Sequence, residues 1–597
     1  MSVKVNDDMG HFFQTKKGLR QGDPLSPVLF NLVADILAVL IERSTKLDHF
    51  RGLVPHLVEG GLSILQYADD TILFMEDNLD KAENLKTVLY AFEKLSGLKI
   101  NFHKSELFCF GEAKEKVDAY VALFGCKEGV VPFRYLGIPM SHRKLSNKDW
   151  GIIEERFQKK LSSWKGKMLS TGGRLVLINS VLSSLPMFLL SFFRIPKGVL
   201  RKIDYYRSRF FWQCDEHKKK YRLAKWCILC KPKSVGGLGI INLDTQNKCL
   251  LSKWLFKLLN EEGLWQDLLR KKYLKNKTLS QVEKRKGDSQ FWSGLMEVKK
   301  DFLERGRFVV HEGNRVRFWE DLWIGNKPLM KQFPSLYNIV RKKHVTVAKV
   351  LSTTPIGISF RRALTGSNLD LWHKLVGEVT CIQLDKHKDA FSWCLSKTFT
   401  VSSMYKELMK GAGLPAECFA WKVKLPLKIK VFLWYLQQGV ILTKDNLLKR
   451  KWKGSVQCCF CSNNETIQHL FFGCHLARLM WNIVSMSFGI QPPCSIANLF
   501  GSWLKSFPFK LRNQVLIGTA ALCWALWLCR NDVVFHKSNT NSCMQVIFRG
   551  THWIRCWALL SKEEEKLRLL RGCKTLEITA MDVLSKAGWN IFKRIDN

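Results

Sequence analysis

The chain has 597 residues, 46% of them hydrophobic, and its 94 Lys and Arg outnumber 52 Asp and Glu to give a formal net charge of +42 at pH 7. The hydrophobic content excludes a disordered chain, and the length allows several folded domains. The charge exceeds what solubility requires and predicts a polyanionic partner. The 19 cysteines are odd in number and scattered, and the N-terminal segment has no apolar core. We therefore expect reduced thiols and a nuclear or cytoplasmic protein, not a secreted one.

The first predicted elements are a hairpin and a long amphipathic helix. Val3–Val5 and His11–Phe13 are typical of short strands about a polar turn, and the two aspartates between them are expected to be turn residues. Asp23 precedes Pro24, an order typical of a helix N-cap with proline in the first turn. Apolar side chains then recur at helical spacing, at Leu25, Leu29, Leu32, Ile36 and Leu40.

A second hairpin carries two adjacent carboxylates. Residues 62–75 are predicted to form two apolar strands, which puts Asp69 and Asp70 at the turn between them. On its own, the segment Tyr67–Asp70 is an ordinary polar turn. An amphipathic helix with apolar positions from Ala82 to Leu95 is predicted to end at Gly97. Short strands are then expected at Leu98–Asn101 and Leu107–Phe110.

Four motifs follow one another in this part of the chain. They are Gly18–Pro27, Tyr67–Asp70, Ser96–Asn101 with Lys104 and Ser105 just beyond, and Phe133–Pro139. In this order they resemble the palm of the reverse transcriptases of non-LTR (LINE-type) retrotransposons. Further segments resemble the plant members of that group, namely Leu161–Trp164, Leu169–Arg174 and Val316–Trp319. The resemblance therefore extends over most of the chain.

The resemblance implies roles for particular palm residues. In the family, the paired aspartates, here Asp69 and Asp70, hold catalytic Mg²⁺ for nucleotidyl transfer, a reaction that uses two metal ions. The residues implied to contact nucleotide or template are Arg20, Gln21, Gly22, Tyr67 and Lys104. For Arg20 and Lys104, a solvated side chain is an open alternative. The Gln21–Gly22 turn is alternatively an ordinary loop before a helix.

The family also uses a third carboxylate, set in an apolar, Phe-containing strand earlier in the palm. The residues before Gly18 contain no such strand. We therefore expect an N-terminally truncated reverse transcriptase that is catalytically inactive as it stands.

Pattern and resemblance together predict an α+β protein. Its expected parts are a partial reverse transcriptase palm with an antiparallel sheet (1–140), a helical thumb or connection (141–300), a connecting region (301–410), a zinc-binding domain (411–482) and a helical, basic C-terminal region (483–597). The closely spaced glycines of Val235–Gly239 lack the dinucleotide-binding spacing and are interpreted as a turn. The uncharged run Val515–Cys529 is too short for a comfortable membrane span and predicts a buried helix.

A cysteine and histidine cluster marks a second site. Cys458, Cys461, His469 and Cys474 have the spacing C-x2-C-x7-H-x4-C, and four such ligands suit a tetrahedral, structural Zn²⁺. Cys459 lies inside the first pair, so that either neighbouring thiol could ligate. The alternative is a set of buried cysteines beside a core histidine. With its flanking residues, the cluster resembles the zinc-binding domain that follows plant retroelement reverse transcriptases.

The sequence thus predicts a reverse transcriptase (RNA-directed DNA polymerase) domain protein derived from a non-LTR retrotransposon. Its expected partners are an RNA template and a DNA primer, without membrane insertion, and its expected cofactors are Mg²⁺ and a structural Zn²⁺. One alternative is a non-catalytic, zinc-containing nucleic-acid-binding remnant. Another is a chain that assembles with a separate fragment carrying the rest of the palm.

Overall fold

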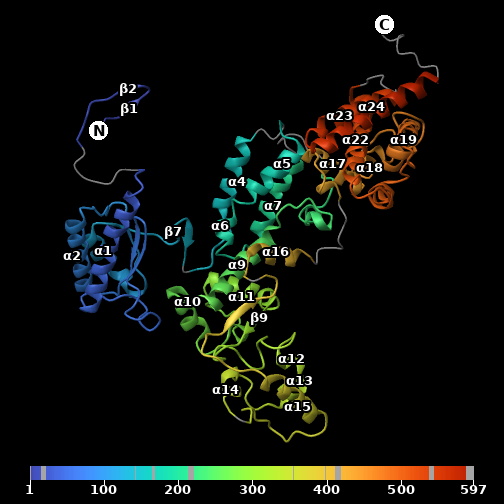
Figure 1. Ribbon diagram of the computed structural model, residues 1–597. Coiled ribbons are helices and arrows are strands. Elements are labelled where there is room, and N and C mark those ends of the chain that lie inside the picture. Colours follow the sequence, from blue (N-terminus) through green and yellow to red (C-terminus); the bar gives the residue numbers. More distant parts are fainter. Residues whose placement is uncertain are drawn as a thin grey trace. The chain divides into compact units, whose positions relative to one another are not determined.

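Figure 1 shows the computed structural model of the chain. The residues that the structure describes are 2–14, 22–141, 143–164, 168–212, 221–353, 355–396, 398–410, 419–536 and 543–586. The chain divides into two compact units, each made of two stretches: Met1–Leu145 with Trp254–Lys397, and Ser146–Lys253 with Thr398–Asn597. The fold is mixed α+β, as predicted, and its described strands form two-stranded sheets. The predicted boundaries of the five parts remain predictions.

The N-terminal hairpin is present but is tighter than predicted. Strand β1 (Lys4–Val5) pairs with β2 (Asp8–Met9), so the second strand is not His11–Phe13. Asn6 and Asp7 form the turn at positive φ, 49° and 73°, as the type I′ hairpin turn requires. Asn and Asp tolerate this conformation, and that preference moves the turn closer to the N-terminus.

Helix α1 (Ser26–Lys46) begins later than the sequence suggested. Leu25 holds the N-cap position, and Asp23 Oδ1 instead accepts a hydrogen bond from Leu25 N at 2.9 Å. Asp23 therefore makes a local turn, a common alternative to capping for this side chain. The buried face also differs from the predicted one. It consists of Ala34, Leu37, Ile41 and Ser44, whereas the side chains of Leu25, Leu29 and Leu32 are exposed.

A small core joins α1 to the second hairpin and to α2 (Leu79–Ser96). Asn78 caps α2 by accepting from Lys81 N at 3.0 Å, and Gly97 ends it at φ 71°, as predicted. The buried side chains of this core are Leu37, Ile41, Phe50, Leu85, Leu89 and Phe92. Strands β3 (Ile64–Tyr67) and β4 (Asp70–Leu73) lie against it through Ile64 and Leu73.

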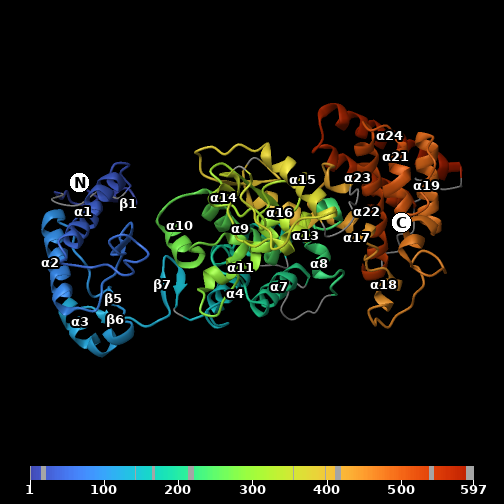
Figure 2. The same ribbon diagram turned by 90° about the horizontal axis from the view of Figure 1, so that it is seen from below.

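The rest of the stretch Met1–Leu145 consists of short elements. The strand predicted at Leu98–Asn101 does not form, because the side chain and carbonyl of Asn101 accept from Lys104 N and close a turn instead. Near the other predicted strand, β5 (Glu106–Leu107) pairs in parallel with β6 (Lys127–Glu128). Figure 2 labels these two strands next to each other, close to α3. The remaining elements here are the 3₁₀ helix η1 (Gly111–Lys116), α3 (Val117–Phe124) and the hairpin of β7 (Phe133–Tyr135) and β8 (Ile138–Met140).

The second stretch of the first unit is built around one antiparallel pair. Strand β9 (Gly306–Val309) pairs with β10 (Ala390–Trp393), with Val309 opposite Ala390. Between these strands lie α12 (Leu329–Gln332), α13 (Pro334–Ile339), α14 (Val347–Leu351) and α15 (Ser367–Thr380). Before them come α10 (Leu264–Leu269), η5 (Arg270–Leu274), η6 (Leu279–Gln281) and α11 (Gln290–Leu303). Helix α9 (Leu243–Asn260) contributes residues to both units.

The second unit is helical in its described residues. Its first stretch contains α4 (Gly151–Ser163), α5 (Thr171–Leu177), η3 (Ile178–Leu182), α6 (Met187–Leu190), α7 (Lys197–Trp212), α8 (Trp226–Leu229) and η4 (Lys233–Val235). The segment Val235–Gly239 forms the expected turn, with Gly236 and Gly239 at positive φ.

The second stretch of this unit holds a large hydrophobic core. Its elements are α16 (Val401–Lys410), η7 (Phe419–Trp421), α17 (Leu427–Gln437), α18 (Lys444–Leu448), η8 (His469–Gly473), α19 (His475–Phe488), α20 (Ile496–Asn498), η9 (Leu499–Trp503), α21 (Leu504–Ser506), α22 (Arg512–His536), α23 (Cys543–Ala558) and α24 (Glu563–Lys586). One hydrophobic cluster runs from Ala420 to Ala580 and takes side chains from α17, α19, α22, α23 and α24. These helices form the orange and red part of the ribbon in Figure 1. The run Val515–Cys529 lies inside α22, as predicted. Among the described residues, no helix is both long and apolar enough to cross a membrane.

Candidate active-site hairpin and metal centre

The acidic pair lies at the tip of the β3–β4 hairpin. Tyr67 pairs with Asp70, which leaves Ala68 and Asp69 as the two residues of the turn. Ala68 has φ 52°, a left-handed conformation that an alanine seldom adopts and that turns the chain tightly enough to bring the two strands together. Both carboxylates are exposed. Below the tip, Gln66 Nε2 donates to Ala34 O of α1 at 3.4 Å, so the hairpin is fixed to the core helix.

A tyrosine from the fourth motif interacts electrostatically with this tip. Burial raises the pKa of Tyr135, and the negative charge of Asp70 raises it further. The ring of Phe108 stacks on that of Phe133 in β7, with 4.2 Å between ring centroids. The sequence singled out the motif Phe133–Pro139 but gave Tyr135 no role at the site.

The structure describes Gly22 and Lys104 among the other expected nucleotide-binding residues. Arg20 and Gln21 lie outside the described residues. Gly22 has φ 88° in an exposed turn, a conformation that suits glycine. Lys104 is exposed in the turn that Asn101 closes, and within the described part of the chain no hydrogen bond or ion pair joins it to the aspartates. Among the described residues, the hairpin brings Tyr67, Asp69 and Asp70 together at its tip.

The second site brings the four expected ligands together. The ligand atoms of Cys458, Cys461, His469 and Cys474 all lie within 4.8 Å of one another. Cys461 Sγ is 3.1 Å from His469 Nε2, and Cys458 Sγ is 4.0 Å from Cys474 Sγ. Two thiolates on one tetrahedral Zn²⁺ are about 3.8 Å apart, given Zn–S bonds of about 2.3 Å. The donor set and its spacing therefore fit zinc.

Local hydrogen bonds set the positions of these ligands. Cys458 N donates to Asn463 O at 2.7 Å, which folds the first two cysteines into a tight loop. Cys474 N donates to His469 O at 2.6 Å across the π-helical turn η8, so these two ligands face the same way. Cys459 groups instead with Cys458 and Glu465. The four-ligand cluster therefore contains Cys458 and Cys461 but not Cys459.

The hydrogen bonds within the cluster favour the ionised form of Cys458 and the protonated forms of its neighbours Cys459 and Cys474. The Cys459 and Cys474 thiols donate hydrogen bonds to Cys458 Sγ and lower the pKa of Cys458. The same hydrogen bonds raise the pKa values of Cys459 and Cys474. A divalent cation stabilises thiolates in such a cluster better than shared protons do, because it neutralises several of them at once.

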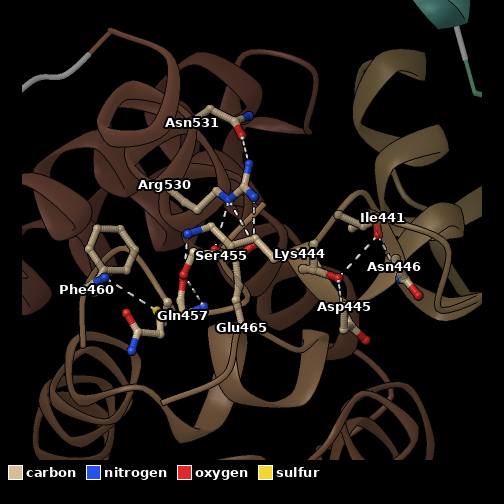
Figure 3. Close-up of polar contacts among 12 residues, drawn as sticks. Ile441, Lys444, Asp445, Asn446, Ser455, Gln457, Phe460, Glu465, Arg530 and Asn531 are labelled. Carbon is tan, nitrogen blue, oxygen red and sulfur yellow. Dashed lines mark hydrogen bonds and ion pairs between the residues drawn. The ribbon is translucent and has the colours of Figure 1, made fainter. Parts of the chain in front are cut away.

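A buried ion pair fixes the metal loop to helix α22. Glu465, between the two ligand pairs, is fully buried, and Arg530 Nη2 lies 2.7 Å from Glu465 Oε1 (Figure 3). The same carboxylate accepts from Lys444 N at 3.0 Å. Figure 3 also shows Arg530 reaching Asn531, whose Oδ1 accepts from Arg530 Nη1 at 3.1 Å. Sequence reasoning did not find this pair, because its members are 65 residues apart.

Two family matches agree with this geometry. Residues 2–140 match the family described as reverse transcriptase (RNA-dependent DNA polymerase), and residues 399–481 match the family described as zinc-binding in reverse transcriptase. The chain therefore contains a reverse transcriptase domain followed by a domain of the zinc-binding family found in reverse transcriptases. The reverse transcriptase family implies nucleic acid substrates and the use of a divalent metal ion.

The chain is also similar to individual proteins over parts of its length. It is 30% identical over 364 residues to a putative ribonuclease H protein of Arabidopsis thaliana, covering 58% of this chain and 57% of that protein. It is 29% identical over 144 residues to an uncharacterized mitochondrial protein of the same plant, covering 24% of this chain and 93% of that protein. It is also 24% identical over 335 residues to a retrovirus-related Pol polyprotein from the type-1 retrotransposable element R2 of Popillia japonica, covering 53% of this chain and 47% of that protein. The chain thus spans about half the length of the first and third of these relatives.

Proposed function

We propose that this chain derives from the RNA-directed DNA polymerase of a non-LTR retrotransposon and that Asp69 and Asp70 are two of its metal-binding carboxylates. The observation that carries the proposal is the hairpin, which presents both carboxylates at one exposed tip above a packed core. Mg²⁺ is the proposed cation, because it prefers hard oxygen ligands. When bound, it would stabilise the attacking and leaving oxygens of nucleotidyl transfer.

The proposed partners are an RNA template and a DNA primer. The net charge of +42 supports a partner with a phosphate backbone. Such a partner and reduced thiols are both found in the nucleus and cytoplasm, where we expect the protein to act. A site for two metals needs more oxygen ligands than one pair of carboxylates supplies. We therefore propose that this chain alone binds a template and primer without extending the primer.

The test separates metal binding from synthesis. With Fe²⁺ in place of Mg²⁺, locally generated hydroxyl radicals should cleave the chain near residues 67–71, and Mg²⁺ should compete this cleavage away. Asp69→Asn and Asp70→Asn should each abolish the cleavage. The matched control is Asp7→Asn, which changes an aspartate in another exposed hairpin turn and should leave the cleavage unchanged.

Primer extension on an RNA template gives the second readout. No extension is expected from the full chain. Extension that Asp69→Asn abolishes would refute the inactivity and keep the metal assignment. Extension that survives both substitutions, together with unchanged Fe²⁺ cleavage, would refute the assignment of the carboxylates.

A second candidate function is a zinc-containing nucleic-acid-binding protein without catalysis. In the second unit, cationic groups lie over aromatic rings, with Lys233 Nζ 4.7 Å from the ring centre of Trp421 and Lys428 Nζ 5.1 Å from that of Trp524. Protein side chains fill all four zinc positions, which is typical of a structural metal. Loss of RNA binding on chelation, with Asp69 and Asp70 dispensable, would favour this function over the first.

A further inference from the structure

A second cluster of metal-ligating side chains lies in the first unit, far along the chain from the cysteines. His311 follows β9, and Asp385 and His387 precede β10. His311 Nδ1 is 2.9 Å from Asp385 Oδ2, and His387 Nδ1 is 3.1 Å from Asp385 Oδ1. All three ligand atoms lie within 4.8 Å of one another. We propose that His311, Asp385 and His387 form a binding site for a borderline divalent cation, with Zn²⁺ as the probe ion.

The separations suit a metal ion as well as hydrogen bonds. A nitrogen and an oxygen on one tetrahedral Zn²⁺ are about 3.4 Å apart, given bonds of about 2.0–2.1 Å. The observed separations are slightly shorter, 2.9 Å from His311 Nδ1 to Asp385 Oδ2 and 3.1 Å from His387 Nδ1 to Asp385 Oδ1. Because each imidazole faces a different oxygen, an ion between them would need both oxygens of the carboxylate or a small turn of that group. Both nitrogens face the same carboxylate, and metal binding would replace the protons that the three groups now share.

The backbone around the cluster is fixed on both sides. Asp385 N donates to His311 O at 3.0 Å, and Glu312 N donates to His387 O at 3.0 Å, so the two segments are paired beyond the end of the β9–β10 sheet. The buried carboxylate of Asp389 accepts from His311 N and Gly313 N, each at 2.8 Å. The histidine backbones are therefore held in place without a metal, which reduces the entropy lost on binding.

Two nearby positive charges pair with a carboxylate outside the cluster. Lys388 Nζ lies 2.5 Å from Glu262 Oε1, and Arg315 Nη2 lies 3.6 Å from the same oxygen. Glu262 thus partly neutralises two cations that would otherwise oppose a divalent ion. Two imidazoles and one carboxylate favour Zn²⁺, Ni²⁺ or Cu²⁺ over Mg²⁺ or Ca²⁺, which prefer sites built of oxygen ligands alone.

The position of the cluster indicates what a bound ion would do. His311 and Asp385 are 74 residues apart and lie where the segment carrying α12–α15 leaves and rejoins the sheet. An ion held by both sides would cross-link the base of that segment. His387 is 83% exposed, so a fourth position open to solvent would be filled by water.

The experiment measures zinc stoichiometry on the full chain. The protein is freed of metal with a chelator, titrated with Zn²⁺ alone in a calorimeter, and analysed for bound zinc after buffer exchange. Two zinc ions per chain are expected, a tight one at the thiolates and a weaker one at the histidine cluster. The double variant His311→Ala/His387→Ala should bind one, and Cys461→Ala should lose only the tight ion. The control His103→Ala, an exposed histidine in a turn, should bind two.

A milder variant guards against misfolding. His387→Gln changes an exposed side chain and should weaken the second site at least tenfold while amide exchange in β9 and β10 stays unchanged in the absence of metal. With Zn²⁺, exchange in residues 311–317 and 385–389 should slow in the wild-type chain and not in this variant. A wild-type chain that binds only one zinc ion, or a double variant that keeps two, would overturn the proposal.

Discussion

Breaking the buried Glu465–Arg530 pair should lower the free energy of unfolding of the zinc-binding part of the second unit more than any single surface substitution does. Glu465 is 0% and Arg530 2% exposed, and three contacts of 2.7–3.2 Å join them. Glu465→Ala leaves the guanidinium buried without its counter-ion, which costs about 3–5 kcal/mol. It also removes the acceptor of Lys444 N, for about 1–3 kcal/mol more. The expected loss in free energy of unfolding is roughly 4–6 kcal/mol, since such terms are not fully additive.

The double variant provides the decisive comparison. Glu465→Leu/Arg530→Met removes both charges and keeps much of the buried volume, and such replacements are often neutral or stabilising. It should therefore be at least about 2 kcal/mol more stable than the sum of the two single losses predicts. Glu465→Gln keeps an acceptor for Lys444 N and should fall between wild type and Glu465→Ala.

Amide exchange of the full chain suits this test, because a protein of two units does not unfold in one step. Protection of peptides from α17, α19 and α22 reports the local free energy of opening, measured with zinc at saturation so that ligand loss is a separate readout. A coupling energy below about 0.5 kcal/mol would refute the reasoning, since it would mean that the two charges do not stabilise each other.

Three further predictions follow from single residues. Gly172→Ala should destabilise the packing of α5 on α17 by about 1–3 kcal/mol, because the new Cβ would lie 2.9 Å from a backbone nitrogen of α17. The control Gly173→Ala adds a Cβ that meets only ordinary contacts and should be neutral or slightly stabilising. Denaturant unfolding of both variants measures the difference. Burial raises the pKa of Asp321 to about 6, so the folded state holds this proton more tightly than the unfolded chain does. Stability of the first unit should therefore fall, by on the order of 3 kcal/mol, as pH rises from about 4 to about 7, and Asp321→Asn should flatten this dependence in urea titrations followed by tryptophan fluorescence. Gly97→Ala should destabilise the fold by about 1 kcal/mol, because Gly97 has φ 71° at the end of α2. Gly377→Ala lies within α15 and should instead stabilise the fold by about 0.5–1 kcal/mol. Equal effects of the two substitutions in thermal unfolding would contradict the role given to the backbone conformation of Gly97.

Elements governed by local chemistry could be predicted from the sequence. The β3–β4 hairpin and the end of α2 at Gly97 depend on alternation and on one glycine, both visible within a few residues. The strand expected at Leu98–Asn101 failed for a local reason as well, since Asn101 offers its backbone neighbours a turn that competes with pairing. The buried face of α1 could not be predicted, because periodicity does not specify which turns of a helix have a partner to pack against.

The candidate sites also divide into features set by local sequence and features set by tertiary contacts. The zinc ligands fall within seventeen residues of one another, so spacing alone predicts that they converge. The ion pair that supports them and the cluster at His311 join residues 65 and 74 apart, and no spacing rule covers such distances. Tyr135 is an intermediate case, since the sequence marks its motif but not its electrostatic interaction with Asp70.

The zinc-binding family match ends at residue 481, but the core that surrounds the metal loop does not. Phe432 of α17 packs edge-on against Trp524 of α22, with ring centroids 4.9 Å apart, and Arg530 of α22 reaches into the loop. Each large side chain that loses such a partner gives up about 1.5–3 kcal/mol of burial. A fragment of residues 399–481 should therefore aggregate or stay unfolded even with zinc, while a fragment of residues 399–586 should be soluble. A folded, zinc-loaded 399–481 fragment would refute this reasoning, because it would show that the metal loop is stable without the packing of α22–α24.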